Sequence, residues 1–150
     1  MGFGVLLAAH FLAGLAHFSH NAEFLPFYPG MPDWLTPARV YLAWGAVSAV
    51  GALALALAWR RWILCALLVF AVYGALGLDG LLHYTLGLCS EHTWVANLTI
   101  VAESLSGLCV LLASAVLAWR YLSTGRFTPG GAGLGGHLSG GSTCLKPMDF

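Results

Sequence analysis

The chain has 150 residues, of which 59% are hydrophobic and only 8% are charged, and its formal net charge is zero. Soluble domains carry about 25% charged residues, so this composition excludes an ordinary water-soluble globular protein. The neutral charge balance gives no indication of a nucleic-acid partner. A lipid bilayer is the expected partner, because apolar side chains can then face outward.

Four apolar stretches follow one another along the chain, at about 2–20, 40–59, 62–84 and 94–119. A transmembrane helix needs about 20 apolar residues. The sequence therefore predicts an all-α, polytopic membrane protein, with a four-helix transmembrane bundle over residues 1–122. The first stretch lacks the positively charged segment of a signal peptide, so we expect it to be retained as the first span.

The segments outside these stretches are predicted to be irregular. Residues 21–38 contain four prolines, which exclude a regular helix through the whole segment. Residues 123–150 are rich in glycine, which predicts a flexible cytoplasmic tail. The cysteines match neither a zinc motif nor a short disulfide scaffold, so we expect four separate thiols at Cys65, Cys89, Cys109 and Cys144.

The arginines indicate how the chain is oriented in the membrane. Arg60 and Arg61 separate the second and third stretches, and Arg120 and Arg126 follow the fourth, whereas Arg39 alone lies near the opposite ends. Positive residues remain on the cytoplasmic side. The pattern predicts a multi-pass protein of the cell (inner) membrane with both termini in the cytoplasm.

Ionisable side chains inside the spans are the strongest indication of a function. A charged group in a span costs several kcal/mol, so each one needs a partner or a purpose. Apart from cysteine and Tyr73, the ionisable side chains of the spans all fall in the half of the bundle away from the arginine turn: His10, His17, Asp79, His83 and Glu103. Three further groups are expected at the mouth of this half: His20, Glu23 and His92.

Spacing and depth divide these groups into two predicted layers. His10 and His17 are seven residues apart and share a helix face, and Asp79 and His83 are four apart and can touch. We expect a deep layer that pairs His10 with Glu103, and a shallow layer of His17, Asp79 and His83. Asp79 would orient or charge His83. Glu103 would be protonated or paired, because an isolated carboxylate is too costly at that depth.

Three interpretations of the cluster remain open. It can be a structural polar network, in which each contact contributes about 1 kcal/mol. It can be an outward-facing site for a ligand, a proton or a divalent metal such as zinc, iron or manganese, with His17, Asp79 and His83 as metal ligands. It can also hold haem b between His17 and His83. We favour the second interpretation, in a binding or accessory membrane protein.

Whether the protein is an enzyme also stays open. A membrane-embedded enzyme or redox protein would act on a lipid or quinone that enters between the helices, with His83 or Glu103 as acid or base. That hypothesis needs a lateral opening lined by aromatic residues beside Glu103. An accessory subunit would instead present a long apolar face, toward a homo-oligomer or a larger membrane complex.

The first half of the chain carries a family resemblance. The sequence HFSHNAEFLPFYP at 17–29, followed by Val40-Tyr41-Leu42 and a Gly/Ala-rich apolar stretch, resembles DoxX-like membrane proteins. These are small four-helix bacterial proteins, some of them associated with quinone-linked oxidoreductases. The resemblance implies a four-helix fold and carries over no catalytic residue. The second half, with GLDGLLHY at 77–84, looks like small bacterial membrane proteins without an assigned role.

Overall fold

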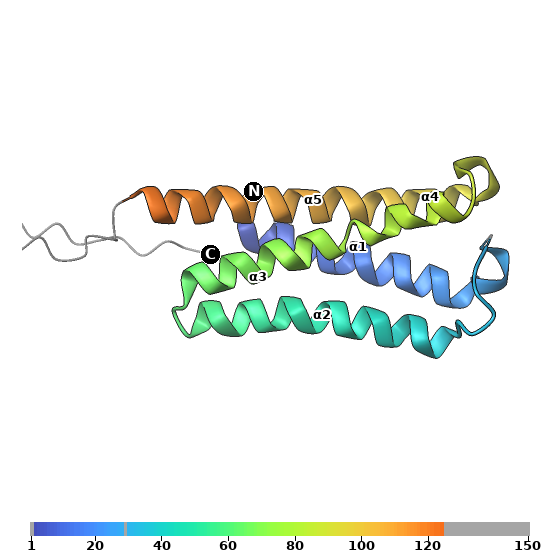
Figure 1. Cartoon of the computed structure of the whole chain (residues 1–150), viewed down its shortest axis with the longest axis horizontal. Coiled ribbons are helices and arrows are strands. Elements are labelled where there is room, and N and C mark those ends of the chain that lie inside the picture. The colour runs from blue at the N-terminus through green and yellow to red at the C-terminus, as the bar shows by residue number, and fades with distance from the viewer. Residues whose placement is uncertain (1, 29, 125–150) are drawn as a thin grey trace, which may run out of the picture.

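The computed structural model describes residues 2–28 and 30–124, and this part of the chain is all-helical (Figure 1). Residues 125–150, which make up nearly all of the predicted tail, lie outside the described residues. The α-helices are α1 (Phe3–Glu23), α2 (Pro37–Trp59), α3 (Ile63–Leu76), α4 (His83–Leu86) and α5 (Trp94–Ser123). Short 3-10 helices are η1 (Leu25–Phe27), η2 (Asp79–Leu82) and η3 (Cys89–Glu91).

Four helical segments are long and apolar enough to cross a membrane: Phe3–Glu23, Pro37–Trp59, Ile63–Leu86 and Trp94–Ser123. They confirm the prediction of four apolar helices. Large apolar side chains cover their outer faces; Leu42, for example, is 73% exposed. Such a surface is suited to lipid, where apolar side chains have no reason to avoid the solvent.

The helix ends differ from the predicted limits for local reasons. α2 begins at Pro37, earlier than expected, because Thr36 caps it by accepting a hydrogen bond from the Arg39 amide at 3.4 Å. Proline is favoured at this first position, where its missing N–H costs nothing. Thr93 caps α5 in the same way, through the Ala96 amide at 3.2 Å.

The helices alternate in direction and form a closed ring, in which α1 and α3 each contact both α2 and α5 (Figure 1). We call the end that carries Arg60, Arg61 and Arg120 the arginine end. The opposite end, formed by residues 24–28, 30–36 and 87–93, is the loop end. An apolar core of Ala54, Ala66 and Phe70 fills the bundle toward the arginine end.

The third span approaches α5 unusually closely. A Cβ atom on Gly74 would lie 2.6 Å from the Gly107 carbonyl oxygen, and one on Gly107 would lie 2.6 Å from the Gly74 carbonyl oxygen. A Cβ atom on Gly77 would collide with the His10 ring. Small residues allow such backbone contact between helices in lipid. The glycines therefore decide where the polar groups of α1, α3 and α5 meet.

The third span is also interrupted. α3 ends at Leu76, and the chain passes through η2 before α4 completes the span. A 3-10 helix turns by about 120° per residue, instead of the 100° of an α-helix. This change of pitch exposes Asp79 and buries Gly80 against the interior.

Candidate functional site

Buried polar side chains gather inside the bundle between α1, the third span and α5. His10 and His17 on α1 are each only 2% exposed, and Glu103 on α5 is 3% exposed. Asn21 continues the same face of α1, four residues after His17, and is also buried. The structure therefore places His10, His17 and Glu103 in the interior, as the sequence predicted.

The deepest contact is made by His10, but its partner is not the predicted one. His10 Nδ1 is hydrogen-bonded to Ser106 Oγ at 3.1 Å, and Nε2 donates to the Tyr73 carbonyl at 3.4 Å. The expected His10–Glu103 pair is not among the described hydrogen bonds and ion pairs. Ser106 lies almost one turn farther along α5 than Glu103, so it is the α5 residue at the depth of His10.

Glu103 faces His17 instead. His17 Nε2 lies 3.7 Å from Glu103 Oε2. This separation exceeds a direct hydrogen bond but is short enough for a strong charge interaction when both groups are ionised. The pair joins α1 to α5 within the half of the bundle nearer the loop end.

Asn21 connects His17 to His83, and sequence reasoning missed its role. The Asn21 amide nitrogen lies 3.1 Å from His17 Nε2 and 3.1 Å from His83 Nε2. The two rings meet edge to face, with their centroids 5.3 Å apart. The predicted grouping of His17 with His83 therefore forms, with an amide at its centre. The spacing of four residues between His17 and Asn21 was the available signal.

These contacts define one consistent set of proton positions. The Asn21 amide donates one hydrogen to each histidine, so both rings accept at Nε2 and carry their proton on Nδ1. His17 Nδ1 then donates to Thr99 Oγ1 at 3.4 Å, and Thr99 donates to the Ala96 carbonyl at 3.0 Å. In this neutral state, the Nε2 lone pair of His17 already accepts a hydrogen bond from the Asn21 amide.

The carboxyl group of Glu103 is consequently left without a partner. Its Oε2 atom is buried and has no hydrogen bond within the described part of the chain, and the same holds for Ser104 Oγ. A buried carboxylate that lacks a partner is costly unless it is protonated or balanced by a nearby charge. Glu103 is thus the group in this site whose state most needs an explanation.

Asp79 does not make the predicted contact with His83, although its charge acts on Glu103. It is exposed on η2, and the structure gives it no hydrogen bond or ion pair to His83 within the described residues. The predicted contact assumed continuous α-helical geometry, in which residues four apart lie on one face. The 3-10 turn through 79–82 rotates Asp79 away from His83.

The arrangement fits neither predicted cofactor. No group of three or more His, Cys, Asp or Glu side chains that could hold a metal ion is found among residues 2–28 and 30–124. The metal site predicted from His17, Asp79 and His83 lacks its third ligand, because Asp79 faces outward. Haem b between His17 and His83 does not fit either, since the Asn21 amide occupies the space between their Nε2 atoms.

At the loop end, Tyr28 organises the mouth. Its ring lies 5.2 Å from that of His83 and 5.8 Å from that of His92, centroid to centroid. Burial raises the pKa of Tyr28 to about 12, so its hydroxyl stays protonated and donates to His20 Nδ1 at 2.7 Å. Of the predicted mouth residues, His20 and His92 surround Tyr28, whereas Glu23 is exposed and accepts from Tyr41 at 3.0 Å.

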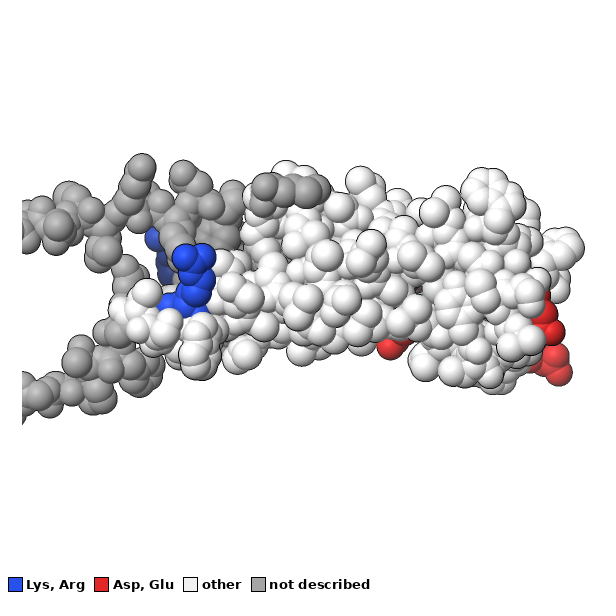
Figure 2. Space-filling view, turned by 90° about the horizontal axis from the view of Figure 1, so that it is seen from above, with Lys and Arg blue, Asp and Glu red and all other residues white. Residues whose placement is uncertain are grey.

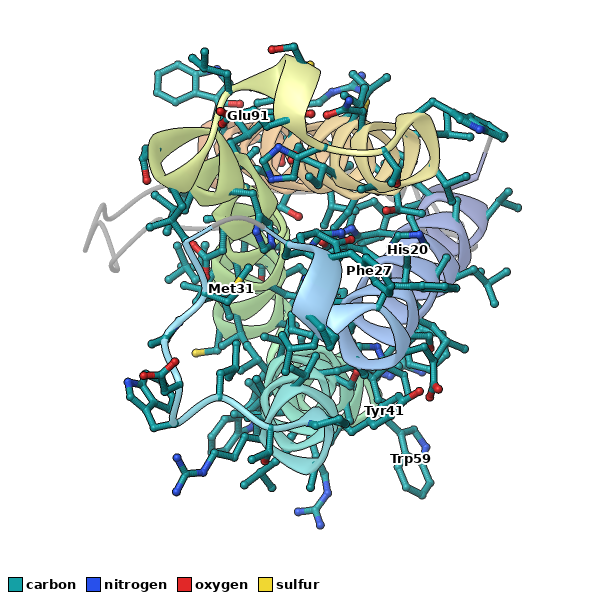
Figure 3. The ribbon with its side chains drawn as sticks, turned by 90° about the vertical axis from the view of Figure 1, so that its right-hand side faces the viewer. His20, Phe27, Met31, Tyr41, Trp59 and Glu91 are labelled. Carbon is teal, nitrogen blue, oxygen red and sulfur yellow. The ribbon has the colours of Figure 1, made fainter. Side chains whose placement is uncertain are left out.

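His92 is held from one side only. Its Nδ1 donates to the Leu88 carbonyl at 3.0 Å, while its buried Nε2 has no partner in the described structure. It borders a cavity of about 360 Å³ with mainly aromatic and apolar walls: His20, Phe24, Phe27, Tyr28, His92, Thr93, Trp94, Val95 and Ala96. Figure 3 looks onto this end and shows His20 and Phe27 side by side, while Trp59 points outward from α2.

The cavity does not reach Glu103. Ala96 is its lining residue nearest to Glu103 in sequence, and the seven intervening steps correspond to about 10 Å along α5. The lateral opening beside Glu103 that the enzyme hypothesis required is therefore not this cavity.

Comparison with known proteins adds no relative. The chain matches no family model, no curated protein and no solved structure. The resemblance of its first half to DoxX-like proteins stays a prediction.

Proposed function

We propose that the chain crosses the cell (inner) membrane four times, with both termini in the cytoplasm. Figure 2 shows the basic side chains at one end of the bundle and acidic side chains toward the other. Arg60, Arg61 and Arg120 belong to the arginine end, and of the described basic residues only Arg39 lies at the loop end. The positive-inside rule supports a cytoplasmic arginine end.

Two native cysteines allow this orientation to be tested. Cys89 is exposed in the segment between α4 and α5, whereas Cys144 belongs to the C-terminal segment. Variants that retain only one of them are treated with a membrane-impermeant maleimide in intact cells. We expect labelling of Cys89 in intact cells, and labelling of Cys144 only after permeabilisation. The reverse pattern would contradict the proposed orientation.

We further propose that the protein binds a proton at the His17–Glu103 pair, which serves as an outward-facing His/carboxylate site. The observation that carries this proposal is the buried Glu103 Oε2 atom, which has no hydrogen-bond partner in the described residues and lies 3.7 Å from His17 Nε2. An ionisable group held inside a membrane span is by default a hypothesis of a functional site. A proton requires no third ligand, unlike a metal, so it matches the groups that are present.

The pair can take two forms that differ only in the position of one proton. In the first, Glu103 is protonated and His17 is neutral, with Asn21 donating to His17 Nε2. In the second, His17 carries the proton and its positive charge balances the Glu103 carboxylate. His83, Tyr28 and His92 continue from Asn21 toward the loop end, so protons would enter from the outer side.

Infrared spectroscopy of the purified full chain in lipid tests the proton site. A pH titration should show the carbonyl band of a protonated carboxylic acid, which Glu103→Gln removes. Glu91→Gln is the matched control, because Glu91 is an exposed carboxylate at the loop end and should leave the band unchanged. If Glu103→Gln has the same titration difference spectrum as the wild type, the cluster is a structural network.

The cavity at the loop end supports a second function, binding of a lipid-phase ligand such as a quinone. The specific observation is the unpartnered His92 Nε2, an acceptor beside aromatic walls. A short-chain quinone should quench tryptophan fluorescence saturably, and Trp94→Phe should remove the saturable part. Trp62→Phe, at the arginine end, is the control. Quenching that is linear with quinone concentration in all three proteins would exclude this site.

A further inference from the structure

Gly80 faces the buried carboxyl group from the third span. A Cβ atom on Gly80 would lie 3.4 Å from Glu103 Oε2, 3.6 Å from Ser104 Oγ and 3.7 Å from His17 Nε2. Three polar atoms from two other helices thus converge on the position where this residue has no side chain. We call the space that they border the Gly80 notch.

Two of the three atoms need a hydrogen-bond partner. Glu103 Oε2 and Ser104 Oγ are both buried and have none within the described residues. Buried polar groups are nearly always satisfied, by protein or by an ordered water. A buried water typically makes about three hydrogen bonds to otherwise unsatisfied polar groups. The chemistry of the Gly80 notch therefore matches a water molecule.

Resting on the proposed proton site, we infer that the Gly80 notch binds one water molecule, which transfers the proton between His17 and Glu103. In the ionised form, the water accepts from the Ser104 hydroxyl and from the Nε2–H of His17 and donates to Glu103 Oε2, while the Asn21 amide no longer donates to His17 Nε2. In the neutral form, the protonated Glu103 Oε2 donates to the water. A bridge of this kind is needed, because the 3.7 Å between His17 Nε2 and Glu103 Oε2 is too long for direct transfer.

The transfer balances without any other reactant. The water gives one of its protons to Glu103 Oε2 and takes the Nε2 proton of His17. The His17 N–H bond and one water O–H bond break, while a new water O–H bond and the Glu103 O–H bond form. An ionised pair becomes a neutral pair, and the water is regenerated. Asn21 then donates to the freed Nε2 lone pair of His17.

Gly80→Ala provides a direct test. The added Cβ meets its neighbours at 3.4 Å or more, which is ordinary contact, and Gly80 has no positive φ, so we expect the variant to fold. The methyl group occupies the Gly80 notch. After a pH jump, the rate of Glu103 protonation should fall about tenfold, as expected from losing one hydrogen bond of the transfer path. Gly80→Ser supplies a hydroxyl at this position and should restore most of the rate.

The water itself is detected by infrared difference spectra in H₂¹⁸O. The wild type should show a water O–H band that shifts with the isotope and disappears in Gly80→Ala. Gly45→Ala is the control, because nothing lies within 4 Å of its Cβ position. This control should keep the water band. Ser104→Ala, which removes one partner of the water, should weaken the band and offers a second route if Gly80→Ala does not fold.

The possible failures are distinguishable. A Glu103 band that titrates normally, without an isotope-sensitive water band and with an unchanged rate in Gly80→Ala, overturns the water and leaves the proton site standing. A complete absence of a titrating Glu103 band overturns the proton site and the transfer together. If the position of the Glu103 band changes with the monovalent cation that is added, the Gly80 notch binds a cation, and this result also overturns the proposal.

Discussion

The Asn21 amide donates to His83 Nε2 at 3.1 Å and thereby joins the first span to the interrupted third span. The same amide donates to His17 Nε2 at 3.1 Å, so one side chain pairs with the Nε2 acceptors of two imidazole rings. Inside a membrane each of these acceptors would otherwise be left without a partner. Asn21 is therefore the centre of the polar network, although it carries no charge.

Replacing Asn21 with leucine should destabilise the bundle. The two imidazole acceptors lose their donor in a buried setting, which costs about 1–3 kcal/mol for an unsatisfied group. Reversible unfolding in mixed micelles measures the change. Thr85→Val is the control, because the Thr85 hydroxyl is exposed and donates only to the Leu82 carbonyl. Wild-type stability in Asn21→Leu would show that the amide contributes no stability.

Gly77→Ala should disrupt the packing of α1 and α5 against the third span. Its Cβ would overlap the His10 ring and lie 3.3 Å from Gly107 Cα, so the helices must separate. We expect a loss of about 2 kcal/mol or more, in the upper part of the usual range for single substitutions. Gly45→Ala is the matched control, since nothing lies within 4 Å of its Cβ position. Equal stability of the two variants would contradict this account of the glycine contact.

High pH should weaken the loop end through Tyr28. Burial raises its pKa from 10.0 to about 12, so the folded state retains this proton more strongly than the unfolded state. The stability associated with the neutral phenol is fully present below pH 10 and is lost as the pH rises from 10 to 12. Unfolding measured across this window should show a decline that is smaller in Tyr28→Phe. Tyr121→Phe, near the end of α5, should behave as the wild type.

Asp79→Asn should leave the buried carboxyl band of Glu103 in place but change its titration. Asp79 is exposed and makes no hydrogen bond to His83 within the described residues, so the variant should keep the cluster intact, whereas the loss of its negative charge removes an electrostatic interaction with Glu103. His83→Phe removes the second acceptor of Asn21 and should alter the rate at which Glu103 exchanges protons with the outer side. If Asp79→Asn abolishes the Glu103 titration and His83→Phe does not, the sequence-based expectation for Asp79 was correct and the arrangement described above is not.

The four helices could be predicted because the amino-acid composition of each stretch is enough to indicate a span. Long apolar stretches with few charges specify spans regardless of how the helices pack. The burial of His10, His17 and Glu103 followed from the same logic, since ionisable groups in spans avoid lipid. The grouping of His17 with His83 was also expected from their similar depths.

The pairing within the cluster was harder to predict, because it depends on local pitch and on close backbone contact. The predicted layers assume that the third span is one continuous α-helix, whereas η2 changes the rotation at Asp79 and Gly80. A glycine occurs at every third residue of this part of the span, at Gly74, Gly77 and Gly80. This spacing was the sequence signal for the interruption. Because α3 approaches α5 closely at Gly107, His10 lies at the level of Ser106. Glu103 therefore faces His17 instead of His10.

The length of α5 gives membrane thickness a direct influence on the buried carboxyl group. Trp94 and Trp119 are both largely exposed and stand 25 residues apart, which is about 38 Å of helix. Tryptophans anchor at the headgroups, and the hydrocarbon layer is about 30 Å thick. A thinner bilayer increases the mismatch and forces α5 to tilt. Because Glu103 and Ser104 belong to α5 while His17 belongs to α1, such a tilt shears the two halves of the proton site against each other. For the proposed proton site, we therefore expect the protonation of Glu103 to depend on acyl-chain length.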